Sequence, residues 1–310
     1  MELTVKDVPE MYSEMMIVMR MRGLFEESRN GPVLSLPEPI TVTVLAPKIR
    51  ANVDPIRNAN PFFHLMEFVW MMSGSCELAW IQQFNQGFKQ YAEDNGRIHG
   101  AYGYRWRNHF GVNQIAAAVN MLREDATNRR VVLGMWDPGW DLDVIKKDLP
   151  CNTHIYLRII DWELEMTVCN RSNDVIWGMT GANAVHMTLL QELMANAIGC
   201  DVGVYRVFTN NAHVYTDLPN VESMLDTRNA IHVKYSPWKH VPVLGEGETL
   251  AMFLKDCERF VSGGWPYETR WIQEVAVPVR ERYLDRELEY PIADSEWEQA
   301  CNLWLQRKCQ

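Results

Sequence analysis

The residue with the most evident chemistry is Cys151, which directly follows Pro150 and lies twenty residues before Arg171. An ionised cysteine is a strong nucleophile, and nearby cations lower the pKa of a thiol from about 8.5. Arg129 and Arg130 precede Cys151, and Arg171 follows it. Guanidinium groups also bind phosphate through paired hydrogen bonds, so one cluster would both activate sulfur and hold an anionic substrate. An isolated cysteine is more often a core residue, so this interpretation depends on the surrounding motifs.

The composition predicts a globular enzyme. The chain has 310 residues, of which 47% are hydrophobic and 23% are charged. No Gly/Ser-rich or Pro-rich linker divides it, so we predict one domain over residues 1–310. The formal net charge of −10 argues against duplex DNA, another specific nucleic acid or an anionic membrane as the main partner. A small anionic ligand in a local arginine pocket remains compatible with this charge.

Targeting signals and metal-ligand patterns are not evident. The first residues lack a basic stretch followed by an apolar core, and no run of about eighteen apolar residues occurs. We therefore expect neither a signal peptide nor a membrane span. The seven cysteines are scattered, without a Cys-x-x-Cys pair. This predicts reduced thiols in a cytoplasm, without a disulfide framework or a metal site.

Two segments predict the elements that position the chemistry. Residues 60–72 predict a buried helix, because proline near its start precedes apolar residues on almost every side. Its one carboxylate is Glu67. Residues 153–169 alternate and are rich in Ile, Tyr, Leu and Val, which predicts a hairpin with its turn at 161–163. Cys151 is then expected at the edge of this hairpin.

The rest of the chain carries further helical and strand patterns. Residues 183–198 have helical spacing and are followed by Gly199, a typical helix stop. A further strand pair is expected near 204–208, and helices are expected at 249–261 and 294–305. We find no internal repeat and no low-complexity tract.

Several short segments together carry a family resemblance. They are Arg-Asn-Gly at 29–31, Tyr-Gly-Tyr-Arg-Trp-Arg at 102–107, Arg-Arg at 129–130, Pro-Cys at 150–151, Arg-Ser-Asn-Asp-Val-Ile-Trp-Gly at 171–178 and His-Val-Tyr at 213–215. In type, order and spacing they resemble the thymidylate synthase superfamily, which includes the phage deoxypyrimidylate hydroxymethylases. The resemblance implies an α/β (α+β) fold, in which helices pack on a twisted mixed sheet that forms the dimer interface. Residues 216–310 carry helical patterns and no motif that we recognise.

The resemblance implies a covalent mechanism. A pyrimidine ring is unreactive at C5 until a nucleophile adds at C6, and Cys151 is expected to make that attack. Glu67 is expected to organise the water that moves protons on and off the base, because its apolar neighbours make an ordinary surface position implausible. Tyr102 and Asp174 are expected as further catalytic residues.

The resemblance also implies the binding residues. Arg129 and Arg130 are expected to cross to the partner's phosphate site, which implies a homodimer with shared active sites. For this arginine pair, the simpler alternative is a solvent-exposed turn. For His213 and Tyr215, the simpler alternative is a buried pair whose hydrogen bonds are satisfied within the protein. The full sets are Arg29, Arg129, Arg130, Arg171 and Ser172 for phosphate, Asn183, His213 and Tyr215 for base and sugar, and Arg57, Phe88, Tyr91, Asp174 and Gly178 for folate.

Departures from the synthase pattern favour one of two products. Both branches of the superfamily take a one-carbon unit from 5,10-methylenetetrahydrofolate; hydride then gives methyl, whereas water gives hydroxymethyl. Asn152 stands where the synthase has histidine, and Phe88 and Tyr91 stand where it has a tryptophan pair. A smaller ring near the folate would let water compete. The chain also ends at 305–310 without the apolar, valine-ended tail of the synthase. We therefore expect hydroxymethylation.

Another difference from the synthase pattern bears on which pyrimidine base the protein recognises. Synthases carry asparagine four residues after the Gly178 position, and the cytosine-specific hydroxymethylase carries aspartate there. This chain has Ala182 and then Asn183. Either a one-residue shift lets Asn183 read the ring, or a water and His186 replace it. Because a carboxylate is absent at that spacing, uracil is slightly favoured over cytosine. The family glutamine five residues after the nucleophile is replaced by Tyr156.

Three alternatives remain open. The first is a thymidylate synthase or a methylase of dCMP on the same scaffold. The second is a nucleotide- or RNA-binding protein that lost catalysis, which the co-occurrence of Cys151, Glu67 and Asp174 argues against. The third is a cysteine hydrolase using His154 or His186, which leaves the arginines unexplained.

Overall fold

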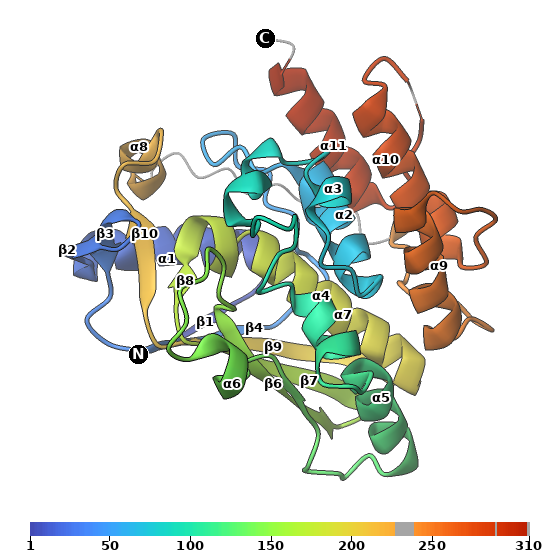
Figure 1. Ribbon diagram of the computed structural model, residues 1–310. Coiled ribbons are helices and arrows are strands. Elements are labelled where there is room, and N and C mark those ends of the chain that lie inside the picture. Colours follow the sequence, from blue (N-terminus) through green and yellow to red (C-terminus); the bar gives the residue numbers. More distant parts are fainter. Residues whose placement is uncertain (227–238, 289, 309–310) are drawn as a thin grey trace.

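A mixed six-stranded sheet forms the base of the computed structural model, which describes residues 1–226, 239–288 and 290–308 (Figure 1). The β1–β4 and β7–β9 pairs are parallel, and the other neighbours are antiparallel. This agrees with the expected mixed α+β architecture. Across the sheet the strands are β1 (Glu2–Val5), β4 (Ile40–Val44), β9 (Asp201–Thr209), β7 (Glu163–Asn170), β6 (Asn152–Ile160) and β5 (Val132–Gly134).

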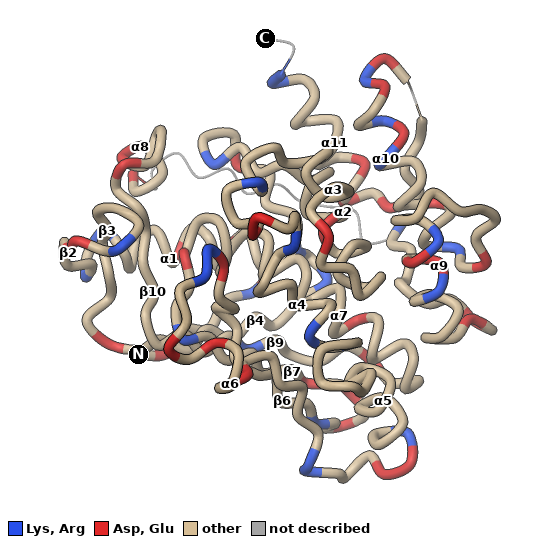
Figure 2. The backbone as a smooth tube through the Cα atoms, viewed as in Figure 1, with Lys and Arg blue, Asp and Glu red and all other residues tan. Residues whose placement is uncertain are grey.

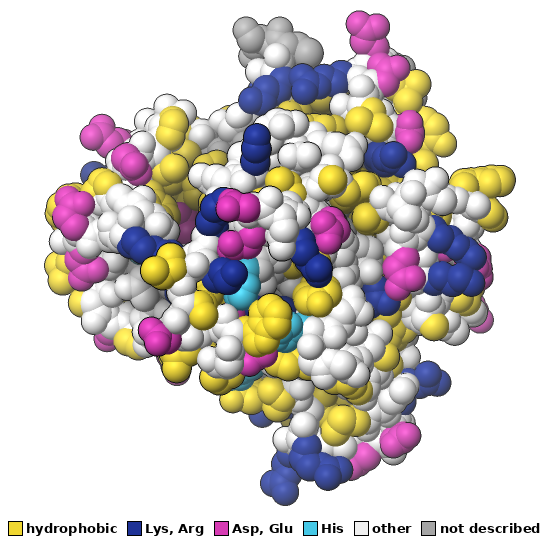
Figure 3. Space-filling model, viewed as in Figure 1, with side chains coloured by type: hydrophobic (Ala, Val, Ile, Leu, Met, Phe, Trp, Pro, Cys, Tyr) yellow, Lys and Arg dark blue, Asp and Glu magenta, His cyan; other side chains and the backbone are white. Residues whose placement is uncertain are grey.

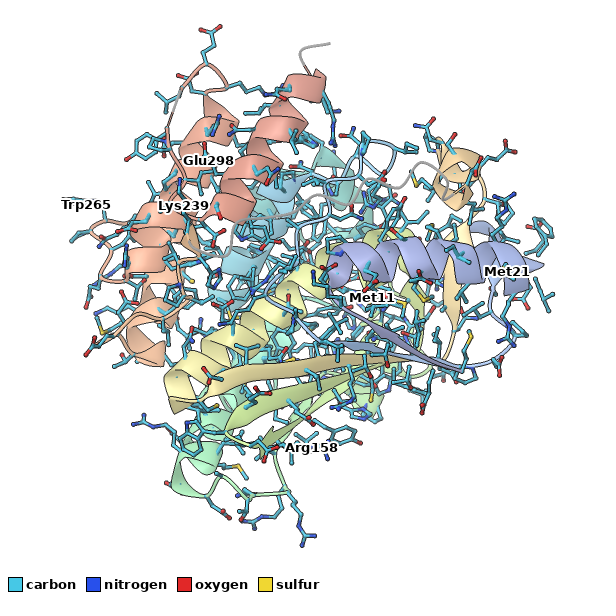
Figure 4. The ribbon with its side chains drawn as sticks, turned by 180° about the vertical axis from the view of Figure 1, so that it is seen from behind. Met11, Met21, Arg158, Lys239, Trp265 and Glu298 are labelled. Carbon is cyan, nitrogen blue, oxygen red and sulfur yellow. The ribbon has the colours of Figure 1, made fainter. Side chains whose placement is uncertain are left out.

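The β6–β7 hairpin confirms the alternation seen in the sequence. Asp161 and Trp162 form its turn with φ of 49° and 66°. Ile155 and Leu157 point into the core, whereas Tyr156 and Arg158 are exposed on the opposite face. Figure 4 shows Arg158 on the side of the sheet away from α1 and α7. The expected strand pair near 204–208 is wrong, because those residues belong to one long strand, β9, which lies between β4 and β7.

A second, four-stranded sheet gathers motifs that are far apart in the chain. Its order is β2-β3-β10-β8. The register places His213 of β10 opposite Asp174 of β8 and opposite Ser35 of β3. This small sheet therefore joins the N-terminal loop to the segment after Cys151. Its strands are β2 (Leu24–Ser28), β3 (Gly31–Ser35), β8 (Asn173–Asp174) and β10 (Ala212–Tyr215).

Two helices form the layer above the large sheet, and a third packs on this layer. In Figure 1, α1 (Val8–Arg22) and α7 (Ala182–Ile198) lie across one face of it. The helix expected at 183–198 is confirmed, and Gly199 ends it in the left-handed conformation with φ of 92°. The helix α2 (Pro61–Met72) packs against α7. Every residue of α2 except Glu67 is buried, as its continuous apolar sequence predicts.

The C-terminal part contains helices at both predicted positions. Here α9 (Leu250–Ser262) and α11 (Ser295–Lys308) confirm the expectations, and both pack against α2 together with α10 (Val277–Leu284). Residues 309 and 310 of the tail lie outside the described residues. The other helices are α3 (Leu78–Ile81), α4 (Tyr102–Tyr104), α5 (Gln114–Glu124), α6 (Pro138–Asp141) and α8 (Val221–Leu225), with single helical turns at Gln86–Tyr91, Arg105–His109, Val175–Met179 and Ile272–Ala276.

A buried ionic network fixes the C-terminal helices to the rest of the fold. Glu192 of α7 pairs with Arg50 at 2.5 Å and with His240 at 2.6 Å. His240 also lies 3.0 Å from Asp294, and Glu296 of α11 accepts the backbone amide of Arg50. Because breaking a buried pair leaves an uncompensated charge, this network opposes separation of α11 from α7.

The surface charge is mixed. Figure 2 shows acidic and basic residues interspersed along the chain rather than gathered on a basic face. Among the residues that the structure describes, no helix is long and apolar enough to cross a membrane.

Candidate active site

The predicted nucleophile lies where the loop after α6 enters β6. Cys151 is half-buried, and its carbonyl oxygen accepts the backbone amide of Arg171 at 3.0 Å. The Arg171 guanidinium donates to the carbonyl oxygens of Pro150 at 3.0 Å and Leu149 at 3.1 Å, and lies 3.9 Å from the Cys151 sulfur. The predicted Pro-Cys and Arg-Ser segments are therefore held together, with one cation fixed beside the thiol.

The charge balance at Cys151 differs from the expectation drawn from its arginines. Burial raises the pKa of the Cys151 thiol, and the charges of Asp148 and Asp174 add to that effect. Arg171 favours the thiolate but does not outweigh them. Because Arg129 and Arg130 lie elsewhere in this subunit, only one of the expected cations acts on the sulfur. A neutral thiol is thus the resting form within one chain.

Glu67 projects from the buried helix α2 with its side chain only 13% exposed. Burial, with the added charge of Asp148, raises the pKa of Glu67 to about 8. The Nε2 atom of His186 lies 3.4 Å from the Glu67 Oε2 atom and donates to the carbonyl oxygen of His64 at 3.1 Å. Burial lowers the pKa of His186 to about 3, so this histidine is neutral. Glu67 is therefore a carboxyl group that gains and loses a proton near neutral pH.

Tyr102 reaches the nucleophile from α4. Burial raises the pKa of Tyr102 well above its ordinary value, and the charge of Cys151 adds to this, although the backbone at Cys151 and Asn152 favours the phenolate. Gly103 explains how α4 comes so close to α2: a Cβ atom there would lie 1.8 Å from the Met71 carbonyl oxygen. In the Tyr-Gly pair, Tyr102 thus supplies a hydroxyl group, and Gly103 allows the backbones of α4 and α2 to contact each other.

Asp174 and Arg57 form a second polar part of the site. Asp174 accepts the Trp177 amide at 2.6 Å, and burial raises the pKa of Asp174 to about 6. Arg57 is 3% exposed, donates to the Ile176 carbonyl oxygen at 3.1 Å and lies 4.7 Å from the Trp177 ring centroid. Among the residues that the structure describes, both terminal nitrogens of Arg57 and one oxygen of Asp174 are buried without a hydrogen-bond partner. These groups are available to a polar ligand.

Gly178 and Asn183 meet at the start of α7. The Asn183 amide nitrogen lies 3.2 Å from the Asn173 side-chain oxygen. A Cβ atom at Gly178 would lie 2.4 Å from that oxygen and 2.9 Å from the Asn183 nitrogen. Only glycine therefore fits beside this pair of amides. No described residue donates a hydrogen bond to the Asn183 side-chain oxygen, so this atom can accept one from a ligand.

The predicted sugar-binding pair lies on β10. The rings of His213 and Tyr215 meet edge to face at 5.2 Å, and the Tyr215 hydroxyl is 3.5 Å from the Asn30 amide nitrogen. Burial lowers the pKa of His213, and Arg171 adds to this effect. Arg29 lies exposed in the adjoining β2–β3 turn. The β2–β3 turn therefore contacts Tyr215, and His213 on the same strand lies near Arg171.

Phe88 and Tyr91 border the same region. Their rings are 5.8 Å apart, and Phe88 also packs against Trp70. Burial raises the pKa of Tyr91, and the charges of Asp148, Tyr215, Asp174 and Cys151 add to it, which indicates that Tyr91 faces the other predicted residues.

The arginine pair is not brought into this site. Arg129 and Arg130 lie in the exposed turn between α5 and β5, where Arg130 interacts with Asp125. Their expected action on a partner's site therefore stays a prediction, as does the role of Ser172, which is half-buried beside Arg171.

Sequence reasoning missed the carboxylate of Asp148, which lies three residues before Cys151. Its charge acts on Glu67, Tyr91, Tyr102 and Cys151. The family pattern gave no signal for it, because its position is not part of any segment that we matched. The spacing Asp-x-x-Cys was the only sign in the sequence.

An exposed indole of α6, Trp140, packs against two histidines. Trp140 stacks on His99 at 6.1 Å and meets His109 edge to face at 5.0 Å. Figure 3 shows histidine surface beside hydrophobic side chains near the middle of this face, with charged groups close by. Within the described ranges, no cluster of three or more His, Cys, Asp or Glu residues is arranged to hold a metal ion. A cavity of about 540 Å³ between α5 and α9 includes none of the predicted residues.

Comparison with known proteins identifies the family. The sequence model described as "Thymidylate synthase" matches residues 57–235, which is more than half of the chain. The chain belongs to the thymidylate synthase family. The fold expected from the resemblance is thereby confirmed, whereas the dimer interface is not tested.

Curated relatives give a finer comparison. The chain is 42% identical over 219 residues to a protein of Pseudomonas phage M6 named "Deoxyuridylate hydroxymethyltransferase", with 70% of this chain and 62% of the relative covered. Proteins with the same name match from Delftia phage PhiW-14, at 32% over 204 residues, and from Bacillus phage SP01, at 30% over 190 residues. These cover 62% and 58% of this chain, and 56% and 50% of the relatives. The chain thus spans between half and about three fifths of the length of these relatives.

Proposed function

We propose that the chain transfers the one-carbon unit of 5,10-methylenetetrahydrofolate to C5 of dUMP and releases the 5-hydroxymethyl nucleotide. The observation that carries this proposal is the grouping of Cys151, Glu67 and Arg171 in one site of a chain 42% identical to a relative named deoxyuridylate hydroxymethyltransferase. We propose that it acts in the cytoplasm of a phage-infected cell, because the three relatives come from phages.

Cys151 is the proposed nucleophile. The dUMP phosphate would bind near Arg29, Arg171 and Ser172, and this handle would hold C6 over the sulfur. Burial raises the pKa of the thiol. Arrival of the nucleotide and of cations from a second subunit is therefore part of the activation, since charge close to a thiol sets its ionisation.

A homodimer completes this site in the proposal. Arg129 and Arg130 lie exposed after α5, outside the site of their own chain. Tyr156 and Ile160 are exposed on the open face of the large sheet, 49% and 43% respectively. Apolar side chains on a sheet face suit burial against a second copy, which would bring the arginine pair to the partner's phosphate.

The protein groups of the site suit uracil. The ring presents N3–H as a donor and O4 as an acceptor. Asn183 offers a free side-chain oxygen beside Gly178, where no other side chain fits. His213 and Tyr215 would hold the deoxyribose 3′-hydroxyl. A carboxylate, which a cytosine site would favour, is absent at 182 and 183.

The residues around Asp174 fit a reduced folate. The terminal nitrogens of Arg57, which have no partner among the described residues, suit the carboxylates of the glutamate part of folate. The unpartnered oxygen of Asp174 suits the N–H groups of the pterin, and Trp177 is exposed beside them. Tyr91 and Gly178 would complete this surface. The folate supplies a carbon at the oxidation level of formaldehyde. No metal has a role in the proposed reaction.

Glu67 would move protons through water. Its pKa of about 8 allows it to hold and to release a proton during one cycle. Tyr102, between Cys151 and Asp148, would donate a hydrogen bond near the reacting ring.

The ring at position 88 favours water over hydride. Phe88 is packed between Phe63, Trp70 and Tyr91, so its position is fixed and it covers less area than an indole. A smaller shield over the methylene carbon leaves room for water.

The test is incubation of the protein with 5,10-methylenetetrahydrofolate and each of dUMP, dCMP and CMP, followed by mass spectrometry. The expected product is dUMP heavier by one CH₂O unit, with tetrahydrofolate released. A methyl product with dihydrofolate would overturn the proposal in favour of a synthase. Reaction with dCMP alone would overturn the assignment of the base.

A further inference from the structure

Asp148 is a carboxylate in the centre of the site that the mechanism above does not use. It lies in the loop between α6 and β6, three residues before Cys151. One of its oxygens accepts the backbone amide of Gly100 at 2.9 Å. Within the described part of the chain, no cationic group forms an ion pair with it. A salt bridge therefore does not explain why a carboxylate occupies this position.

The surrounding structure fixes this carboxylate tightly. A Cβ atom at Gly100 would lie 2.5 Å from the Asp148 oxygen and 3.1 Å from the Pro150 nitrogen, so only glycine allows the contact. The preceding residue, His99, uses its carbonyl oxygen to accept the Arg105 guanidinium at 3.1 Å. Arg105 is buried and paired at 2.6 Å with Asp141. A rigid network thus holds the Gly100 amide in place.

The neighbouring cations are already engaged. Arg105 forms two hydrogen bonds with Asp141, which also accepts His99 at 2.8 Å. Arg171 donates to two backbone carbonyl oxygens. Burial raises the pKa of Asp148; the Gly100 amide and the charges of Arg105 and Arg171 oppose this effect without outweighing it. No hydrogen bond from a described residue reaches the second oxygen of Asp148, which is therefore left for a ligand or a water.

Asp148 faces the predicted reacting groups. Its negative charge raises the pKa of Glu67, Cys151, Tyr102 and Tyr91, and such repulsion is appreciable only between groups that lie close together with little water between them. Two carboxyl groups in one dry site tend to hold a single proton between them. The Oε2 atom of Glu67 is buried without a hydrogen-bond partner among the described residues, and the pKa of Glu67 is about 8, so Glu67 holds the proton. Asp148 accepts the Gly100 amide and lies near Arg105 and Arg171, so it is the carboxyl group that remains to act as a base.

We propose that Asp148 is the base that removes a proton from the water adding to the methylene carbon on C5, an inference that rests on the proposed hydroxymethylation. The water oxygen bonds to the methylene carbon, and one of its protons passes to the Asp148 carboxylate. The electron pair of the exocyclic C=C bond moves onto the ring and then forms the C5=C6 bond as the C6–S bond breaks. Cys151 leaves as thiolate, and the proton on Asp148 passes to solvent. No oxidant or reductant is consumed.

The division of labour follows from this step. Glu67 serves the proton transfers that precede release of the one-carbon unit from folate. Asp148 serves the later addition of water. A change at Asp148 should therefore separate the two halves of the reaction, whereas a change at Glu67 should stop both.

Asp148→Asn is the main test, because asparagine keeps an oxygen that accepts the Gly100 amide and loses the basicity. With dUMP tritiated at C5 and 5,10-methylenetetrahydrofolate, tritium release in the first turnover should stay within about threefold of the unmodified chain. Formation of hydroxymethyl product should fall about 100-fold, the usual contribution of a general base. Intact-mass measurement should show a Cys151–nucleotide adduct carrying the extra carbon. Added 2-mercaptoethanol should give the C5 thioether, because a thiolate needs no base.

A matched control is Asp143→Asn, an exposed carboxylate on the same loop, which should change neither readout. Asp148→Ala should recover formation of hydroxymethyl product when formate is added, because formate can replace a missing base. If Asp148 had a purely structural role, formate would not restore the product.

Two results would overturn the inference while leaving the proposed function intact. One is hydroxymethyl formation by Asp148→Asn within about threefold of the unmodified chain. The other is an equal loss of tritium release and product without adduct or thioether, which would mark a structural role. Failure of the unmodified chain to form hydroxymethyl product would instead refute the proposed function itself.

Discussion

Replacing Gly103 by alanine tests whether the contact between α4 and α2 aligns the reacting groups. The added Cβ would lie 1.8 Å from the Met71 carbonyl oxygen, 2.4 Å from its carbon and 2.5 Å from its Cα. All three atoms belong to the backbone of a buried helix, so no side chain can rotate away. Real Cβ contacts essentially never fall below 3.0 Å, so α4 must retreat by 3.0 − 1.8 = 1.2 Å or more.

The displacement of α4 should lower the free energy of unfolding, and it should lower the catalytic rate by a larger factor. Overpacking of this kind destabilises a fold by about 1–3 kcal/mol, which lowers the Tm of a protein of this size by about 5 °C. Tyr102, the neighbour of Gly103, would move by about the same distance relative to Glu67 and Cys151. A misplacement of about 1 Å at a reacting centre reduces kcat by about 100-fold. Binding of dUMP should change little, because Arg29, Arg171 and His213 are on other elements.

The assay combines calorimetry, dUMP titration and steady-state kinetics at a temperature well below the Tm of the variant. Gly134→Ala is the control, since its Cβ would approach nothing closer than 3.8 Å. A Gly103→Ala protein with kcat within about threefold of the unmodified chain would show that this contact does not align the site. Equal losses in dUMP affinity and kcat would show a general collapse rather than a displacement of Tyr102.

Four further expectations follow from the same site and network. Cys151→Ala should abolish turnover and leave dUMP affinity within about tenfold, so residual turnover near the unmodified rate would contradict its role. Mixed Cys151→Ala and Arg130→Ala proteins should regain activity in heterodimers, which a monodisperse active monomer in light scattering would rule out. Phe88→Trp should shift the product from hydroxymethyl toward methyl, measured as dihydrofolate formed per nucleotide; an unchanged ratio would remove Phe88 from the explanation. Burial opposes ionisation of His240, but the hydrogen bonds that His240 donates to the carboxylates of Asp294 and Glu192 outweigh it and raise its pKa to about 9. This stabilisation is complete below the ordinary pKa of 6.5 and disappears as the pH rises through about 9, so the urea midpoint should fall over that range, and it should not do so in His240→Gln.

The elements that carry the site could be predicted where local periodicity is strong. The continuous apolar run of α2 identified Glu67 as a carboxylate in a buried helix, and the alternation at 153–169 located the hairpin beside Cys151. Gly199 correctly marked the end of α7. These features depend on residues that are close together in the sequence, so local hydrophobic periodicity and stop residues can predict them.

Features that depend on distant pairing could not be read in this way. β9 is a single strand because β4 and β7 lie on either side of it, and neither neighbour is adjacent in the chain. Burial raises the pKa of Cys151, Asp148 and Asp174 add to this, and Arg171 does not outweigh them, whereas the sequence shows only the arginines, which would lower it. Asp148 itself became visible only once Gly100 and Glu67 were found around it.

The small sheet has a consequence for the order in which the protein matures during synthesis. Strand β3 leaves the ribosome early, but its partner strand β10 is synthesised much later: Leu34 of β3 pairs with Val214 of β10. Strand β1 likewise pairs with β4, which waits for β9. Contacts across such long sequence separations form late, because a long loop must close first. The loop that we propose to bind phosphate is therefore unfinished for most of synthesis, and the proposed nucleotide site is complete only after Tyr215 has left the exit tunnel.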